Sequence, residues 1–153
     1  MLPNEFLAKM DKDISNTGRS IMGVINSHNY TIGQGVRKQP DVIITCNMNH
    51  QTASAILNDV CERFEDGKLN IGKSDQILRG FDAYLLPCTV NIETLITHYV
   101  MQAERYYERK GVECAGYLQL VLPDASGLFP WEKGYGEGMP PQDIFCEVPA
   151  TVH

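Results

Sequence analysis

The strongest fold signal in this chain is the segment Tyr117-Leu118-Gln119-Leu120-Val121-Leu122-Pro123-Asp124-Ala125-Ser126-Gly127-Leu128-Phe129-Pro130-Trp131. Its apolar run predicts a buried strand, the Pro-Asp…Gly spacing predicts a turn, and an aromatic corner with the only tryptophan follows. Gln119 interrupts the strand with one amide. Because a buried polar group without a partner costs about 1–3 kcal/mol, Gln119 is expected to face solvent, to bond a neighbouring segment, or to face a ligand.

Apolar residues at helical spacing predict three helices. The first covers about residues 4–17, and Gly18 is its expected C-cap. The second begins at Asn47 or Asn49 and ends at Gly67, and the third is one long helix from Asn91 to Gly111.

Strands are predicted at residues 20–25, 30–33, 41–46, 76–80, 82–87 and 118–122. The third is expected to be central, because its two faces are both apolar. This order predicts an α+β fold: a mainly antiparallel sheet of five or six strands, with two long helices packed on one face of it and an N-terminal helix. Residues 1–135 are interpreted as one domain, and residues 136–153 as an irregular Gly/Pro-rich tail.

Charge and composition narrow the class of protein. The net charge is −6, which disfavours a nucleic-acid partner. No apolar run has membrane-spanning length, so no membrane partner is expected. Five widely spaced cysteines without a C-x-x-C motif fit reduced thiols, and a cytoplasmic location is predicted.

The loop Gly33-Gln34-Gly35-Val36-Arg37-Lys38 is the first candidate binding element. Two glycines free the backbone to turn its N–H groups toward an anion, and two cations follow within reach of a phosphate. The competing interpretation is a flexible connection with solvated charges, since no helix follows the G-x-G spacing.

The aromatic corner is the second candidate. Phe129 and Trp131 suit stacking on a planar ring, or they close the edge of the core. Arg79, placed by the prediction within a strand, either faces outward or clamps an anion.

Conventional catalytic and metal motifs are missing from the sequence. No histidine pair has metal-ligand spacing, so no metal and no cofactor are expected. His50 lies at a predicted helix start, where a neutral ring can bond a ligand, although a surface capping role competes with that interpretation.

Three landmarks together resemble the domain of unknown function 4262 family. The first is Tyr30-Thr31-Ile32-Gly33 with the apolar strand after Pro40, the second is the central helix, and the third is Leu118–Val121 with the Pro123-to-Trp131 corner. The match runs from about Ile14 to Tyr135, and it departs from the family pattern at Gln34-Gly35, where an apolar residue is usual. The resemblance implies a small intracellular α+β domain of bacteria and phages, without an established general activity. It also implies that the shared positions meet near one surface; these are Tyr30, Thr31, Gly33, Gln119, Pro130 and Trp131.

These observations favour a non-enzymatic protein that captures a small phosphorylated or nucleotide-like ligand. The role implied through the resemblance is sequestration of a nucleotide-derived immune signal of the ADP-ribose type in phage counter-defence. One pocket is predicted between the glycine loop and the tryptophan corner; its residues are Tyr30, Thr31, Gly33, Gly35, Arg37, Lys38, Arg79, Gln119, Phe129 and Trp131.

Two alternative functions compete with ligand capture. The first is a hydrolase or transferase with Glu104 or Asp41 as general base. The second is a protein-interaction module that uses Met139–Val148 as an extended arm. A homo-oligomer is also expected, because Ile144, Phe145 and Val148 of the tail need a cover.

Overall fold

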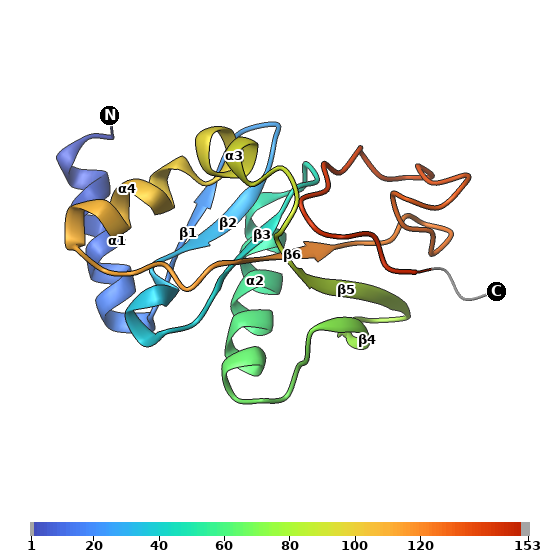
Figure 1. Ribbon diagram of the computed structural model, residues 1–153, viewed down its shortest axis with the longest axis horizontal. Coiled ribbons are helices and arrows are strands. Elements are labelled where there is room, and N and C mark those ends of the chain that lie inside the picture. The colour runs from blue at the N-terminus through green and yellow to red at the C-terminus, as the bar shows by residue number, and fades with distance from the viewer. Residues whose placement is uncertain (1, 151–153) are drawn as a thin grey trace.

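The computed structural model describes residues 2–150 and shows one mixed sheet (Figure 1). Its strands are β1 (Ser20–Gly23), β2 (Asn29–Ile32), β3 (Asp41–Ile44), β4 (Gly72–Leu78), β5 (Phe81–Pro87) and β6 (Tyr117–Val121). Their order is β1-β2-β3-β6-β5-β4, so β3 is an inner strand as predicted. The β3–β6 pair is parallel and all other neighbours are antiparallel. The α+β class with a mostly antiparallel sheet is therefore confirmed.

The first two predicted helices are present. They are α1 (Asn4–Thr17) and α2 (His50–Glu65). Gly18 ends α1 in the left-handed conformation, and the Asn49 side chain caps α2 by accepting from Thr52 N. A short 3₁₀ turn, η1 (Gln34–Arg37), follows β2. None of the helices within residues 2–150 combines the length and apolar character needed to cross a membrane.

The single long helix predicted between Asn91 and Gly111 is wrong. The segment consists of α3 (Ile92–Thr94), a π-helical turn η2 (Leu95–Tyr99) and α4 (Met101–Lys110). A tertiary hydrogen bond accompanies the break: His28 Nε2 donates to the Tyr99 carbonyl at 2.7 Å. In a continuous helix that carbonyl would accept from an N–H of the next turn. Its bond to His28, the residue before β2, therefore favours an interruption of the helix after Tyr99.

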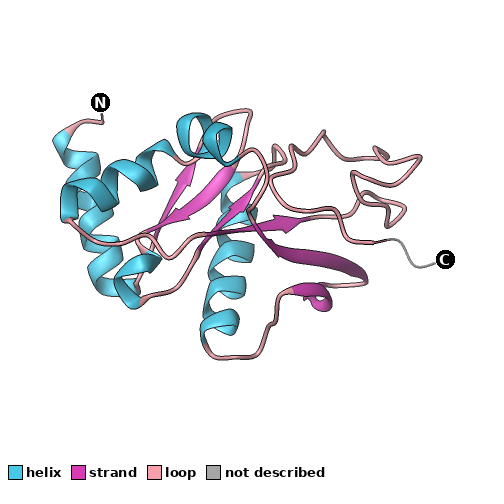
Figure 2. Cartoon of the chain, viewed as in Figure 1, coloured by secondary structure: helices cyan, strands magenta, loops and turns pink. Residues whose placement is uncertain are grey.

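Helices cover both faces of the sheet, which corrects the expectation of one face. Val42 and Ile44 of β3 pack toward α2, in a cluster with Leu57. Ile43, which points the opposite way, packs toward α1 and α4 with Ile14. The second face is completed over β5 and β6 by the chain after Val121, which is almost entirely loop (Figure 2).

Gln119 fastens that C-terminal loop to the sheet. Its side chain is fully buried, and Nε2 donates to the Asp143 carbonyl at 2.7 Å and to Thr45 Oγ1 at 3.1 Å. Its Oε1 accepts from Phe145 N at 2.8 Å. Of the three roles expected for this amide, the structure shows the bond to a neighbouring segment.

Replacing this amide should destabilise the protein. Gln119→Leu leaves the Phe145 N–H without its acceptor and removes the amide bonds to Thr45 and to the Asp143 carbonyl. The free energy of unfolding should therefore fall by about 2–3 kcal/mol in urea titrations. Gln51→Leu, at an exposed position of α2, is the matched control and should change stability by less than about 0.5 kcal/mol. Equal losses in the two variants would contradict the role given to Gln119.

Candidate functional site

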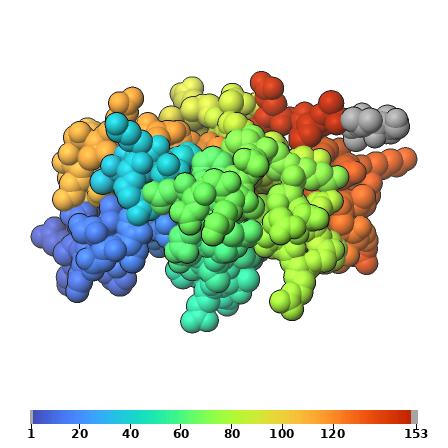
Figure 3. All heavy atoms as spheres, turned by 90° about the horizontal axis from the view of Figure 1, so that it is seen from below, coloured from blue at the N-terminus to red at the C-terminus, as the bar shows by residue number. Residues whose placement is uncertain are grey.

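The glycine loop and the tryptophan corner do not form a shared pocket. β3 and β6 start at the same end of the sheet, where Asp41 pairs with Tyr117, and the glycine loop lies at this end. The corner follows the other end of β6, a strand that spans about 17 Å. Figure 3 shows the segment near residue 36 (cyan) and the segment near residue 130 (orange-red) far apart along the molecule, with α2 and the β4–β5 hairpin between them. The prediction that they wall one cavity is wrong.

Asp41 occupies the centre of a buried polar cluster at the glycine-loop end. It is 1% exposed and accepts from Thr31 Oγ1 at 2.8 Å, from Gln34 N at 3.2 Å, and from the Tyr107 hydroxyl of α4. The Tyr107 oxygen in turn accepts from Gly33 N at 3.2 Å and from Gly35 N at 2.9 Å. The backbone N–H groups expected to hold a phosphate are therefore bound to the chain's own phenol.

Close packing explains the two glycines of this loop. Gly33 has φ +97°, a conformation that L side chains rarely adopt, and a Cβ on Gly35 would lie 2.6 Å from the Glu113 carbonyl. The same loop buries Gln34, whose Oε1 accepts from Arg19 Nε at 2.9 Å. The Gln34 Nε2 also donates to the Pro40 carbonyl at 2.6 Å. The loop is a structural corner in which the polar groups are satisfied internally.

The three cations predicted to meet the ligand do not converge. Arg37 pairs with Glu65 at 2.8 Å, and Lys38 is exposed with φ 59° at the end of η1. Arg79 is not in a strand: it forms, with Gly80, the exposed two-residue turn between β4 and β5. This hairpin lies at the opposite edge of the sheet from β1.

The remaining predicted site residues belong to the interior. Tyr30 is 2% exposed, and its hydroxyl accepts from Gln102 N at 3.2 Å. Phe129 is 4% exposed and stacks on Trp131 with ring centroids 5.4 Å apart. Both rings meet Tyr84 edge-on. The aromatic corner thus closes the core over β5, as the competing interpretation proposed.

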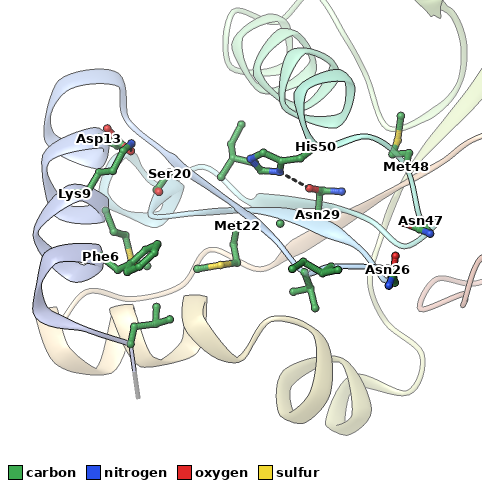
Figure 4. A pocket seen from close by; sticks show the side chains of 16 residues that line it. Phe6, Lys9, Asp13, Ser20, Met22, Asn26, Asn29, Asn47, Met48 and His50 are labelled. Carbon is green, nitrogen blue, oxygen red and sulfur yellow. Dashed lines mark hydrogen bonds and ion pairs between the residues drawn. The ribbon is translucent and has the colours of Figure 1, made fainter.

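A groove between α1 and β1 has a volume of about 550 Å³. Figure 4 shows Phe6, Lys9 and Asp13 on the α1 wall, and Asn26, Asn47 and Met48 at the far end. Lys9 and Asp13 form an ion pair at 3.0 Å, so the charges on this wall cancel. The groove is mainly apolar. Lys9, Asp13 and Ser20 lie at one end of it, and its other polar side chains lie at the opposite end, near Asn29 and His50. A mainly apolar lining with few polar groups is typical of small-molecule sites.

This opposite end is built around Gly23, Asn29 and His50. A Cβ on Gly23 would lie 2.4 Å from His50 Nδ1, so only glycine lets the ring cross the end of β1. The buried Asn29 Oδ1 accepts from His50 Nδ1 at 2.7 Å (Figure 4). The His50 Nε2 lies 3.4 Å from Ser54 Oγ. Contacts at both ring nitrogens therefore hold the ring in one orientation.

Sequence reasoning missed this site, although signals for parts of it existed. Glycine inside a predicted strand often marks a close approach by another group, and this applies to Gly23. The sequence offers His50 as a ligand contact at a helix start, but it gives no signal for Asn29, which lies between the predicted strands 20–25 and 30–33. Within residues 2–150, no group of three or more His, Cys, Asp or Glu side chains is placed to hold a metal ion.

The burial of Asp41 predicts a pH-dependent stability. Desolvation raises its pKa from 3.8 to about 7, against the lowering effect of the bonds from Tyr107 and Thr31. The folded state therefore holds this proton more tightly than the unfolded chain. This proton contributes on the order of 4 kcal/mol to the free energy of unfolding. The contribution is complete below about pH 4 and is lost as the pH rises to about 7.

The test compares the wild type with Asp41→Asn, which is isosteric and has no proton to lose. In urea titrations from pH 4 to pH 8, the wild type should lose stability relative to this variant as the pH rises. A constant difference between the two proteins over this range would contradict the assignment.

The contact between Gly23 and His50 can be tested by a double-mutant cycle. Gly23→Ala should cost about 1–3 kcal/mol of unfolding free energy, because the added methyl overlaps the ring. In a His50→Ala background the cost should be smaller, and what is left reflects the contact of 2.9 Å between the added Cβ and Asn29 Oδ1. The same cost in both backgrounds would show that the ring does not lie against Gly23.

Comparison with known proteins identifies a family for this chain. No curated protein matches the chain, and no solved structure matches it. The family model described as "Domain of unknown function (DUF4262)" matches residues 13–136, which include the sheet, α2, α4 and the aromatic corner. The chain therefore belongs to the DUF4262 family.

Proposed function

We propose that this chain is a non-enzymatic binding protein that captures a small nucleotide-like ligand in the α1–β1 groove. The observation that supports the proposal most is the fixed His50 ring at one end of a 550 Å³ cavity. Ligand sites commonly have volumes of about 300–1,000 Å³, with a few oriented polar groups on apolar walls. The exposed Asn26, Asn47 and His50 side chains are available to a ligand there.

The chemistry of the lining favours a nucleoside-type ring over a highly charged group. Asparagine amides pair with the donor and acceptor edge of a base, and Phe6, which is 60% exposed, offers a ring face to it. Lys9 is the one cation among the described lining residues, and Asp13 neutralises it. A ligand with no charge or one negative charge therefore fits better than a diphosphate.

The biological role in the proposal is sequestration of a nucleotide-derived immune signal. This role rests on the family resemblance and on a groove that is open enough to bind a ligand without converting it. An ADP-ribose derivative carries two phosphates and would have to place them outside the groove, toward solvent. A screen must therefore contain nucleosides and mononucleotides as well as ADP-ribose derivatives.

A thermal-shift screen of these compounds tests the proposal. A ligand at about 100 times its Kd adds about 2.7 kcal/mol, which should raise the Tm by roughly 5–10 °C. His50→Ala should abolish that shift, and Arg37→Ala, a cation outside the groove, should retain it. The proposal fails if no compound changes the Tm, or if Arg37→Ala and not His50→Ala removes the effect.

Hydrolysis is the second candidate function, because Ser54, His50 and Asn29 stand in hydrogen-bonded sequence. The order matches that of nucleophile, base and orienting group in acyl-transfer enzymes. The bases expected from the sequence do not serve it: Asp41 is buried, and Glu104 accepts from the Tyr117 hydroxyl at 2.7 Å. Recovery of the intact ligand after denaturing a complex would exclude turnover, and loss of turnover in Ser54→Ala would support it.

The third candidate, an interaction arm formed by residues 139–148, has lost part of its support. Phe145 is 3% exposed and packs in the core with Tyr30, so the chain itself covers it. Val148, which is 54% exposed, still offers apolar surface. A homo-oligomer remains a prediction, and light scattering against the 17.1 kDa chain mass tests it.

A further inference from the structure

Cys88 and Cys146 face each other across an isolated antiparallel bridge that joins the end of β5 to the C-terminal loop. Thr89 N donates to the Phe145 carbonyl at 2.8 Å, directly beside the pair. That pattern identifies a non-hydrogen-bonded antiparallel pair, in which the Cα atoms lie about 4.5 Å apart and the two side chains share a face. Disulfides join Cα atoms about 4.4–6.8 Å apart, so this backbone geometry admits a bond.

The two thiols differ in access. Both are free, Cys88 is partly exposed and Cys146 is 2% exposed. Burial raises the pKa of Cys88 to about 12, with a further rise caused by the nearby Cys146, and burial raises the pKa of Cys146 to about 11. Because the thiolate is the nucleophile, reaction at neutral pH should be slow and should accelerate as the pH increases.

We propose that Cys88 and Cys146 form a reversible oxidation site that locks the C-terminal loop onto β5. The oxidant is a low-molecular-weight disulfide such as oxidised glutathione. The more accessible Cys88 thiolate attacks it, forms a mixed disulfide and releases one glutathione thiolate. The Cys146 thiolate then displaces the second one, so two protein thiols lose two protons and two electrons and one S–S bond forms.

The disulfide would fix a part of the C-terminal loop that is otherwise held to the sheet by hydrogen bonds. Asp143 and Phe145 are held by the Gln119 amide, and Thr45 Oγ1 donates to the Asp143 carbonyl at 2.7 Å. Beyond the bridge, residues 147–150 form one wall of a hollow of about 440 Å³, opposite Leu86 and Pro87. A covalent bond at Cys146 would fix that wall and close a long loop of the unfolded chain.

The experiment exposes the full-length protein to oxidised glutathione without denaturant. Five free thiols should fall to three, and non-reducing peptide mass spectrometry should find Cys88 joined to Cys146. The Tm should rise by roughly 5–15 °C, and dithiothreitol should reverse the rise. The rate of thiol loss should increase between pH 7 and pH 9.

Variants make the outcome specific. Cys88→Ser should abolish both the thiol loss and the thermal shift, whereas Cys114→Ser, at another partly buried cysteine, should leave both unchanged. Cys88→Ser is preferred to a variant of the buried Cys146, because a substitution at the partly exposed position disturbs the core less. A stable glutathione adduct on Cys88, a different cysteine pair, or the full thermal shift in Cys88→Ser would overturn the proposal.

Discussion

One buried carboxylate organises the end of the sheet on which the loops depend. An Asp41 side chain without partners would be strongly unfavourable at 1% exposure. Thr31 of β2, the Gln34 backbone and Tyr107 of α4 all donate to it, so a single group joins two strands, the η1 turn and a helix. The glycine loop follows this constraint: its N–H groups point to Tyr107 because Tyr107 must reach Asp41.

Gln119 has the corresponding role for the opposite half of the sheet. It joins β6 to Thr45, the residue that follows β3, and to the C-terminal loop through Asp143 and Phe145. Gln119 and the N–H groups of the glycine loop, which the sequence offered as ligand contacts, are thus bonded within the chain. The edge of β1 is open to a ligand: there Gly23 makes room for His50, and exposed amides line an apolar groove.

Local signals in the sequence were sufficient for most elements and insufficient for their packing. Gly18 and the Asn49 cap indicated helix ends, and apolar or β-branched runs located the strands. The exception is β4, which begins at Gly72 and ends at Leu78, whereas a strand was predicted at residues 76–80. The π-helical turn depends on a bond from His28 to the Tyr99 carbonyl, which no local pattern contains. The site was predicted only in fragments, because the fit of Gly23 to the His50 ring is a three-dimensional relation between distant positions.

The central claim is that ligands bind at the α1–β1 edge and not between the glycine loop and Trp131. The most direct test is to titrate a compound that raises the Tm into the protein and to record the chemical shifts of the backbone amide and indole N–H groups. The account predicts the largest changes at Gly23, Asn29 and His50, with the Trp131 indole signal unmoved. Changes concentrated at Gly33–Lys38 and Trp131 would contradict it.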